Sequence, residues 1–427
     1  MQGVYEMKVA THLPLALFLC CGTVYAGGPV IDIPPATLPA ESFFDANPGA
    51  TVNLNSGGGI LAGEFANPFG FNGATLNVFS GSEAGFFTID QFIEDVHVVV
   101  DGGDVIRTKL TGTVGTTTLT LNTGSCERGF WLMGNTSATQ NGGSIGLVGG
   151  GQAALIAEDD ASFTMNDGTI DTFILFNDDS TFTMNGGTIS GGIQLNDNAV
   201  ATMTAGSIGA GGLMSDSTCV FNFSGGTTGD AFVVEKGTIN ISGGALGDNS
   251  ALLNFDGIDP IMNMTSGALG SDFRAYDGTL NIEGGLIGDG FRLGRPTGDG
   301  SGVTLNLVVK SATIDGVPLD LSTTPTVITV RGGAFLSCVM LDEALVGLDL
   351  NEDLVFAEDR IRAAATLTIA LDCQADYTDD GVLDFFDVSA FLAAFGASDP
   401  IADFNGDGSF DFFDVSAFLA AVAEGCP

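Results

Sequence analysis

The clearest hydrophobic pattern in this chain is a short unit that returns almost unchanged. Residues 163–170 carry apolar side chains at Phe163, Met165 and Ile170, and nineteen residues later residues 182–189 repeat the same order. Polar residues lie between the apolar ones and a Gly precedes the last of them, an alternation typical of a half-buried strand that runs into a turn. The unit therefore predicts one strand and one turn of a repeat, and it is too short to be a domain.

The same pattern recurs along most of the chain. Its starts are Val52, Leu76, Val98, Leu119, Ala138, Phe163, Phe182, Ala201, Phe221, Ile239, Met262, Leu280, Leu305 and Ile328. Their mean spacing of about 21 residues lies in the range of solenoid repeats. Helical and leucine-rich repeats are disfavoured because no window of this repeat region has a helical period and Gly is frequent. We expect a mainly β protein with a parallel β-helix (β-solenoid) of about 14 coils over residues 51–340.

Stacked coils place equivalent positions in columns, so the core can be predicted residue by residue. One inward column is Phe163, Phe182, Ala201, Phe221, Ile239, Met262 and Leu280. Its neighbour is Met165, Met184, Met203, Phe223, Ile241, Met264 and Ile282. The polar position between them predicts an outward ladder of Thr164, Thr183, Thr202, Asn222, Asn240, Asn263 and Asn281.

The flanks of the repeat have other patterns. Lys8, an apolar run over residues 13–25 and an A-x-A-like cleavage site that ends at Ala26 predict a signal peptide (residues 1–26). The run is too short to span a bilayer, and we expect a secreted or cell-surface protein. Acylation at Cys20 or Cys21 is the disfavoured alternative, because the residue before each is not small. Pro-rich residues 27–50 are expected to form a leader or linker, and residues 341–372 a cap or linker with a final strand at 367–371.

Charge narrows the possible partners. The 427 residues hold 52 Asp+Glu and 12 Lys+Arg, for a formal net charge of -40. So negative a chain disfavours nucleic acid and anionic membranes and favours cations, above all calcium. No later apolar stretch reaches transmembrane length, so no membrane span is expected.

The repeat offers no recognisable catalytic motif, and we assign no catalytic residue. Two acidic pairs and one Asp–Asn pair recur at nineteen-residue spacing and would stack at one corner of a solenoid: Asp159–Asp160, Asp178–Asp179 and Asp197–Asn198. Such a corner could bind a cation or hold a catalytic pair, but Asp also suits left-handed turns, which is the favoured interpretation. The only local basic cluster, Arg274, Arg292 and Arg295, has no acidic pair beside it in a known motif.

A sharper signal begins at Cys373, after which the chain has no Lys or Arg. Residues 376–387 and 403–414 are twelve-residue loops with oxygen-bearing residues where a calcium loop needs ligands, and Gly381 and Gly408 at the sixth position. The sequence thus predicts two Ca²⁺ sites. The first would use Asp376, Thr378, Asp380, the carbonyl of Val382, Asp384 and Asp387; the second Asp403, Asn405, Asp407, the carbonyl of Ser409, Asp411 and Asp414.

Each loop runs into a predicted amphipathic helix. The apolar stripes are Val388, Phe391, Leu392 and Phe395 in the first helix, and Val415, Phe418, Leu419 and Val422 in the second. Two loop–helix units back to back would bury these stripes against each other. Because the carboxylates of each loop repel one another without a cation, folding of this segment should be linked to calcium.

Residues 373–427 resemble a type I dockerin, in which paired F-hand calcium loops end in Asp and bind a cohesin partner. Residues 384–394 and the closing 425–427 also look like the dockerin-like C-termini of secreted planctomycete proteins. Thr378 departs from the Asp or Asn usual in that family. The resemblance implies a cohesin-like partner, and a disulfide between Cys373 and Cys426 if the two ends meet as they do in dockerins.

In that family the residues at loop positions ten and eleven help contact cohesin. Here they are Phe385 and Phe386 in the first loop, and Phe412 and Phe413 in the second. The competing interpretation is that at least one Phe of each pair belongs to the core.

Together these features predict a secreted, non-catalytic β-helical scaffold or surface protein, which could face glycans, anchored by a dockerin-like domain to a cohesin-like protein. A polysaccharide is a further candidate partner. The alternative is a polysaccharide lyase or glycoside hydrolase with a β-helix fold, delivered to a complex by the same domain.

Overall fold

The structure is a computed structural model, and it describes a large part of the chain. The described residues are 30–33, 37–39, 51–56, 59–61, 75–89, 96–146, 153–216, 218–254, 257–294, 302–322, 325–330, 332–351, 360–362, 365–378, 382–405 and 407–424. The predicted signal peptide, together with Asp380, Gly381 and Cys426, lies outside them.

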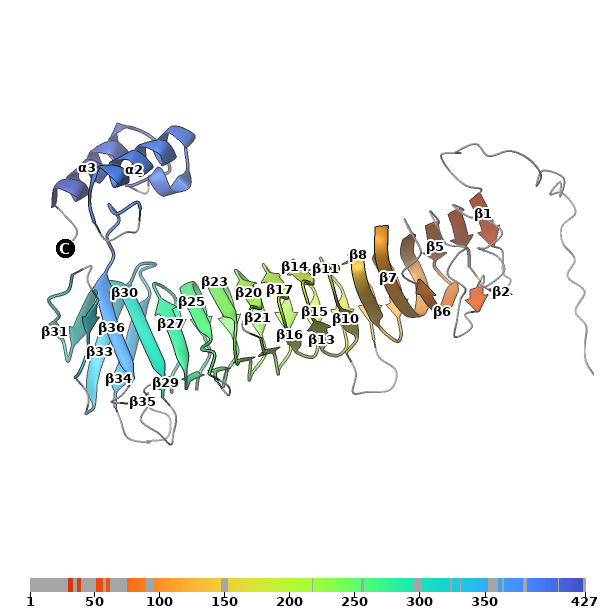
Figure 1. The fold of residues 1–427 in the computed structure, drawn as a ribbon, viewed down its shortest axis with the longest axis horizontal. Helices are drawn as coiled ribbons and strands as arrows, with labels where there is room; N and C mark the ends of the chain where they lie inside the picture. Colours follow the sequence, from red (N-terminus) through yellow and green to blue (C-terminus); the bar gives the residue numbers. More distant parts are fainter. Residues whose placement is uncertain are drawn as a thin grey trace, which may run out of the picture.

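Most described residues form a long rod of parallel strands, with a pair of helices beside its C-terminal end (Figure 1). Each turn of the chain contributes short strands to three parallel ladders. The first ladder consists of β1 (Val30–Ile33), β3 (Thr51–Leu54), β5 (Thr75–Phe79), β7 (His97–Cys126), β8 (Phe130–Gln140), β11 (Ser162–Met165), β14 (Thr181–Met184), β17 (Val200–Met203), β20 (Val220–Phe223), β23 (Thr238–Leu246), β25 (Ile261–Leu269), β27 (Gly278–Ile282), β30 (Val303–Ile314) and β36 (Thr366–Leu371).

Longer strands such as β7 and β8 bend around corners and contribute to more than one ladder. The second ladder adds β2 (Thr37–Pro39), β4 (Gly59–Leu61), β6 (Glu83–Ile89), β9 (Ser144–Ile145), β12 (Thr169–Ile170), β15 (Thr188–Ile189), β18 (Ser207–Ile208), β21 (Thr227–Thr228) and β28 (Leu286–Ile287). The third ladder adds β10 (Leu155–Ala157), β13 (Ile174–Phe176), β16 (Ile193–Leu195), β19 (Leu213–Met214), β22 (Val233–Val234), β24 (Ala251–Leu252), β26 (Arg274–Ala275), β29 (Arg292–Leu293) and β35 (Arg360–Ile361). The parallel β-solenoid predicted from the sequence is therefore confirmed.

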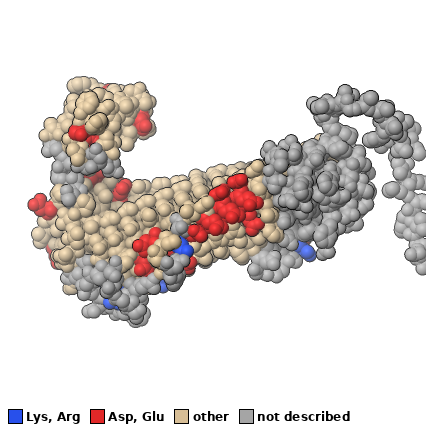
Figure 2. All heavy atoms as spheres, viewed as in Figure 1, with Lys and Arg blue, Asp and Glu red and all other residues tan. Residues whose placement is uncertain are grey.

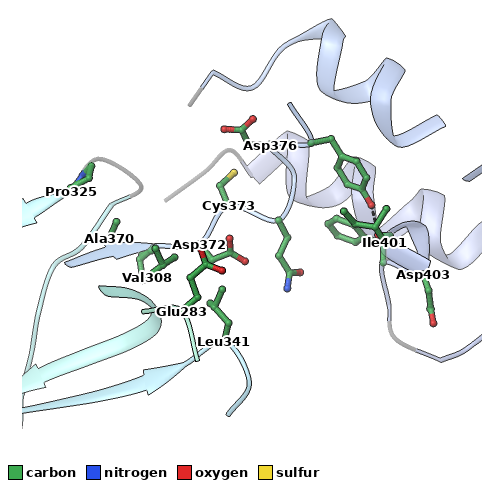
Figure 3. Close-up of a pocket in the computed structure, with 14 residues that line it drawn as sticks. Glu283, Val308, Pro325, Leu341, Ala370, Asp372, Cys373, Asp376, Ile401 and Asp403 are labelled. Atoms are coloured by element: carbon green, nitrogen blue, oxygen red, sulfur yellow. Dashed lines mark hydrogen bonds between the residues drawn. The ribbon is translucent and has the colours of Figure 1, made fainter. Parts of the chain in front are cut away.

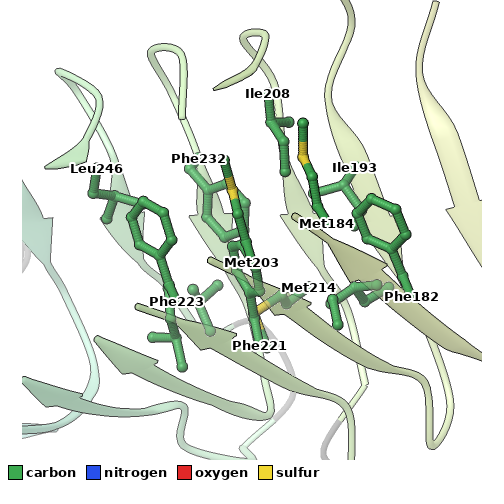
Figure 4. Close-up of a cluster of buried hydrophobic side chains, with 14 of the residues drawn as sticks. Phe182, Met184, Ile193, Met203, Ile208, Met214, Phe221, Phe223, Phe232 and Leu246 are labelled. Atoms are coloured by element: carbon green, nitrogen blue, oxygen red, sulfur yellow. The ribbon is translucent and has the colours of Figure 1, made fainter. Parts of the chain in front are cut away.

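The predicted inward columns match the strand register. Phe163 pairs with Phe182, Phe182 with Ala201, and the column continues in register to Leu280. The second predicted column follows two residues later on the same strands, and the side chains of both columns are at most 1% exposed. Figure 4 shows Phe182, Met184, Met203 and Phe221 packed between successive coils. The Met column is therefore packing, as expected of a flexible apolar side chain.

The predicted polar ladder is also present, as a chain of amide hydrogen bonds. Asn240 donates to Asn222 at 2.9 Å, Asn263 to Asn240 at 2.9 Å, and Asn281 to Asn263 at 2.8 Å. Since each amide has both a donor and an acceptor, identical residues in register satisfy each other along the rod.

The predicted number of fourteen coils is not confirmed. About ten turns, between β7 and β29, present all three ladders among the described residues. The last predicted start, Ile328, is wrong: it follows the short strand β32 (Thr326–Val327), which is antiparallel to β36, and Leu367 takes the place beside Leu305. At the other end, β1 and β2 extend the ladders into the segment predicted as a leader.

Antiparallel strands cover the C-terminal end of the rod. β30 continues past the first ladder and pairs with β31 (Val317–Pro318) and β33 (Ala334–Met340), and β33 pairs with β34 (Leu345–Leu350). Leu336, Met340 and Leu348 are fully buried and belong to the same core as the coils. This change from parallel to antiparallel pairing covers the last coil, which a solenoid requires to avoid an open edge.

Candidate functional site: the C-terminal module

Two short helices form a separate apolar core beside the end of the rod (Figure 1). They are α2 (Phe385–Ala397) and α3 (Phe412–Glu424), joined through a 3₁₀ turn, η2 (Pro400–Ala402). Phe391 and Phe418, one from each helix, stack with ring centroids 4.0 Å apart and both are fully buried. We call the described part of residues 373–427 the C-terminal module.

The first predicted loop is closed by hydrogen bonds to its last residue. Asp387 accepts the backbone N–H of Thr378 at 3.0 Å and that of Asp384 at 2.8 Å, and also the Thr378 hydroxyl at 3.0 Å. Asp384 accepts the N–H of Phe386 at 2.7 Å, which together with the Asp387 contact makes a capping box for α2. One carboxylate thus connects the beginning of the loop, its end and the helix.

The second predicted loop repeats this frame. Asp414 accepts the N–H of Asn405 at 3.2 Å and that of Asp411 at 2.8 Å. Asp403 accepts the N–H of Asp407 at 3.1 Å and that of Gly408 at 2.8 Å. Gly408 has a φ of +79°, so the sharp turn predicted at the sixth position is present.

The two closing carboxylates are unusual in being fully buried. Asp387 and Asp414 are 0% exposed, although the sequence provides no Lys or Arg after position 373. Burial raises the pKa of Asp387, but the hydrogen bonds from Asp384 and Thr378 outweigh it and leave that pKa below its ordinary value. For Asp414 the hydrogen bond from the Asp411 N–H is the main cause of a lowered pKa, opposed by burial and reinforced by Asn405. Both groups are therefore anionic at neutral pH.

This donor set fits a hard cation. A buried anion needs a partner, and the hydrogen bonds above leave each carboxylate with further lone pairs. No cluster of three or more His, Cys, Asp or Glu side chains in metal-binding proximity occurs among the described residues. The predicted sites also use ligands of other kinds, namely Thr378, Asn405 and the carbonyls of Val382 and Ser409. The predicted ligand Asp380 lies outside the described residues.

All four predicted contact residues point to solvent. Phe385 and Phe386 are 76% and 66% exposed, and Phe412 and Phe413 are 74% and 66% exposed. The competing interpretation, that one Phe of each pair lies in the core, is therefore wrong. The two Phe of a pair are consecutive on a helix whose opposite side packs through Phe391 or Phe418, so neither can reach the core.

The predicted apolar stripes need one correction. Leu392 and Leu419 were expected to be buried with Phe391 and Phe418, but they are 52% and 50% exposed. They lie seven residues after Phe385 and Phe412, on the same helix face as those residues. Each helix thus presents an exposed apolar stripe, Phe385–Phe386–Leu392 on α2 and Phe412–Phe413–Leu419 on α3, which we call the paired aromatic faces.

The place of the missing core residues is taken by two aromatics that the sequence interpretation did not single out. Tyr377 meets Phe391 and Phe418 edge to face at 5.4 and 5.5 Å between ring centroids, and Phe404 meets them at 6.2 and 5.6 Å. Both stand at the second position of their loops. The sequence could have indicated their role, because the alignment of the two loops that matches the predicted ligands also matches these two aromatic residues.

A cavity of about 760 Å³ lies between the module and the end of the rod (Figure 3). Its walls come from both parts, with Glu283, Val308 and Leu341 on the rod side and Asp376 and Asp403 on the module side. Asp376 and Asp403 are the first predicted ligands of the two loops. The cavity therefore adjoins both loops at the joint between module and rod.

The stacked Asp residues at one corner of the rod form left-handed turns between strands. Asp159, Asp178 and Asp197 have φ values of 57°, 55° and 51°, and they follow β10, β13 and β16. Asp178 accepts the N–H of Asp159 at 3.1 Å, and Asp197 that of Asp178 at 3.3 Å. The favoured left-handed turn interpretation thus agrees with the geometry, with each carboxylate capping the preceding coil. Figure 2 shows acidic residues gathered along the middle of the rod.

The acidic turn residue Asp178 and the basic residue Arg292 lie far apart on the rod. Arg292 lies on β29, six strand pairings along the third ladder from β13, which precedes Asp178. At about 4.8 Å per pairing this is roughly 29 Å. Arg292 instead pairs with Asp272, and Arg295 lies outside the described residues.

The cysteines divide between the two parts of the molecule. Cys126, Cys219 and Cys338 are buried in the rod core. Burial raises the pKa of the Cys338 thiol to about 12, so it behaves as an apolar side chain. Cys373 begins the module, and since Cys426 lies outside the described residues, the pairing of the two stays a prediction.

The fold places this chain in the class of parallel β-solenoid proteins, here with a C-terminal helical pair. No family model, curated protein or solved structure matches the chain. No helix in the described part of the chain is long and apolar enough to cross a membrane.

Proposed function

We propose that this protein is a secreted, non-catalytic scaffold or surface rod that is anchored through its C-terminal module to a cohesin-like protein. In this proposal the module is dockerin-like and binds two Ca²⁺ ions. The rod would extend away from the anchoring point, with its long sides available to other ligands such as glycans.

The observation that carries the proposal is the combination of buried anions and exposed aromatics in one small module. Asp387 and Asp414 are buried with no basic residue in the segment to neutralise them, which calls for cations in the loops. Phe385, Phe386, Phe412 and Phe413 are exposed immediately beside those loops. Exposed apolar clusters of this kind mark protein-interaction surfaces.

Calcium would then control the interaction directly. The closing Asp of each loop lies two residues after the first exposed Phe of that loop, and its hydrogen bonds fix the start of the same helix. Losing the cation leaves several carboxylates in repulsion and releases that helix start, so the paired aromatic faces would lose their geometry. A Cys373–Cys426 disulfide would fasten the ends of a module whose own core is small.

The test is a calcium titration of the full chain by isothermal calorimetry. We expect two binding events, loss of helical circular dichroism on chelation, and an unchanged β-sheet signal from the rod. Asp387→Ala combined with Asp414→Ala should abolish both events, whereas Asp178→Ala, at an acidic turn of the rod, should leave them intact. Absence of calcium binding in the wild-type chain would remove the dockerin-like interpretation.

The partner is tested by a pull-down from the native secretome with the full chain as bait. A cohesin-like protein should be captured with calcium and lost with a chelator. A variant with all four exposed Phe changed to Ala should still bind calcium but no longer capture the partner. Capture that is indifferent to both the chelator and the four substitutions would contradict the proposed anchoring surface.

A further inference from the structure

Three arginines stack along the third ladder of the rod. Arg274, Arg292 and Arg360 occupy equivalent positions on β26, β29 and β35, which pair in parallel as consecutive strands of the third ladder. The next residue on each strand, respectively Ala275, Leu293 and Ile361, is fully buried, so the arginine side chains leave their strands on the face opposite to the rod core. We call these three residues the arginine ladder.

Such a ladder is unexpected in this chain. Only 12 of 427 residues are Lys or Arg. Strands in a ladder are about 4.8 Å apart, and like charges at that separation repel. Asp272 is the only described residue that forms an ion pair with the ladder, through Arg292. Arg274 and Arg360 have no carboxylate partner among the described residues.

In Arg274 and Arg360 one guanidinium nitrogen is hydrogen-bonded and others are buried without a partner among the described residues. Arg274 Nη2 donates to the carbonyl of Asn249 at 2.9 Å, and Arg360 Nη2 donates to the carbonyl of Gly294 at 2.9 Å. Nε of Arg274 and both Nε and Nη1 of Arg360 are buried and have no hydrogen-bond partner within the described ranges. Buried donors are rarely left unpaired, so these nitrogens indicate a missing acceptor.

Arg360 carries the strongest form of this signal. Only 2% of the surface of this residue is exposed. Burial lowers the pKa of Arg360, and the neighbouring Arg362 and Arg292 lower it further, against the opposing influence of Tyr276. A group in that environment gains from a nearby anion, because the anion both accepts its hydrogen bonds and offsets the positive charges.

The same column is mainly apolar on the preceding coils. Ala251, directly before Arg274, is buried. Beyond it toward the N-terminus lie Val233, Leu213, Leu175 and Ile156, with the polar Gln194 among them, all partly exposed. A ligand lying along this face would contact apolar surface first and guanidinium groups at its end. A linear polymer of sugar rings suits both, since rings present apolar faces and their acidic substituents repeat along the chain.

We propose that the arginine ladder binds closely spaced oxyanions, the carboxylate or sulfate groups of a linear acidic polysaccharide. Arg274 and Arg292, which are partly exposed, contact the ligand from solvent, and Arg360 forms the buried end of the site. Guanidinium suits this role because its planar fork binds carboxylate or sulfate through two parallel hydrogen bonds. The site is independent of the C-terminal module.

The test uses the full chain titrated with an oligogalacturonate, a sulfated oligosaccharide and a neutral oligosaccharide, each at low and high salt. We expect binding to at least one acidic ligand, weakened by salt, and none to the neutral ligand. Arg274→Gln with Arg292→Gln should reduce affinity by roughly tenfold or more, as loss of charge-assisted hydrogen bonds requires. Lys310→Gln, which removes a cation elsewhere on the rod, is the matched control and should change nothing.

Each result decides the proposal. Binding only of the oligogalacturonate assigns carboxylates, and binding only of the sulfated ligand assigns sulfates. Arg274→Lys with Arg292→Lys keeps the charges but not the forks and should bind with intermediate affinity, while thermal unfolding confirms that all variants stay folded. The proposal is overturned by a wild-type chain that binds neither acidic ligand, or by equal losses in the Gln pair and in Lys310→Gln. Loss of calcium binding in the module should leave the polysaccharide affinity unchanged.

Discussion

The rod and the C-terminal module use the same residue type in opposite ways. In the rod, Phe163, Phe182 and Phe221 point inward and are at most 1% exposed. In the module, Phe385 and Phe412 are the most exposed of four repeated Phe side chains that point outward. A coil has a neighbouring coil above and below it, so every inward column is covered along its whole length. The two helices of the module pack through Phe391 and Phe418 and leave the four repeated Phe rings exposed.

The difference shows where each part gets its stability. The rod is held by buried columns that repeat over many coils and by amide ladders between neighbouring coils. The module has a small core and two buried carboxylates without basic partners. A repeated sequence pattern therefore does not by itself show whether the repeated residues serve stability or binding. In this chain the repeat of the rod builds the scaffold and the repeat of the module builds the proposed binding site.

The largest effect is expected when one Phe is removed from each part. Phe182→Ala should lower the free energy of unfolding of the rod by about 3–5 kcal/mol, since the ring is buried between Phe163 and Phe176. Phe385→Ala should change the free energy of unfolding of the module by no more than about 0.5 kcal/mol. Denaturant unfolding of the full chain, followed separately by β-sheet and helical signals, measures both. Comparable losses at the two positions would show that Phe385 is part of a core.

A smaller effect is expected from the amide ladder. Asn240→Ala removes the hydrogen bonds to both Asn222 and Asn263, so the rod should lose about 1–2 kcal/mol. Thr238→Ala, on the same strand, is the control, because its side chain makes no hydrogen bond among the described residues. Equal denaturation curves for the two variants would mean that water replaces the ladder at no cost.

The smallest effect is expected from acid. The pKa values of Asp387 and Asp414 lie below the ordinary 3.8, so the stability that they contribute is present above that pH and is lost as the pH falls through the lower folded values. Protonation removes hydrogen-bond acceptors and predicted calcium ligands together, so both losses act in the same direction. Helical circular dichroism at saturating calcium should therefore fall below about pH 4, near the unfolded pKa.

Asp414→Asn is the control for the acid transition. It cannot titrate at that position and should have a less stable module at neutral pH, with a shallower acid transition. An acid transition in the variant that is identical to that of the wild-type chain would exclude Asp414 as its cause.

The repeating elements could be predicted from the amino-acid sequence, because their signals are local. Apolar and polar positions alternate within four residues, and this was enough to predict both core columns and the ladder from Thr164 to Asn281 in their observed register. The turn and the helix start in the two loops of the C-terminal module could also be predicted, because a sharp turn at Gly408 and a helix cap at Asp384 depend only on neighbouring residues. The left-handed Asp corners followed for the same reason.

Which residues these elements bring together depends on how the elements pack in three dimensions, and this could not be predicted from local patterns. Whether Leu392 joins Phe391 or Phe385 depends on where the second helix packs, which a helical stripe does not specify. The place of Ile328 depended on the antiparallel strands that cover the last coil. Arg360 stacks on Arg292 because the chain leaves the third ladder, forms those strands and returns in register. The length of that excursion is not a local property of the sequence, so the arginine ladder appears only when the chain is folded.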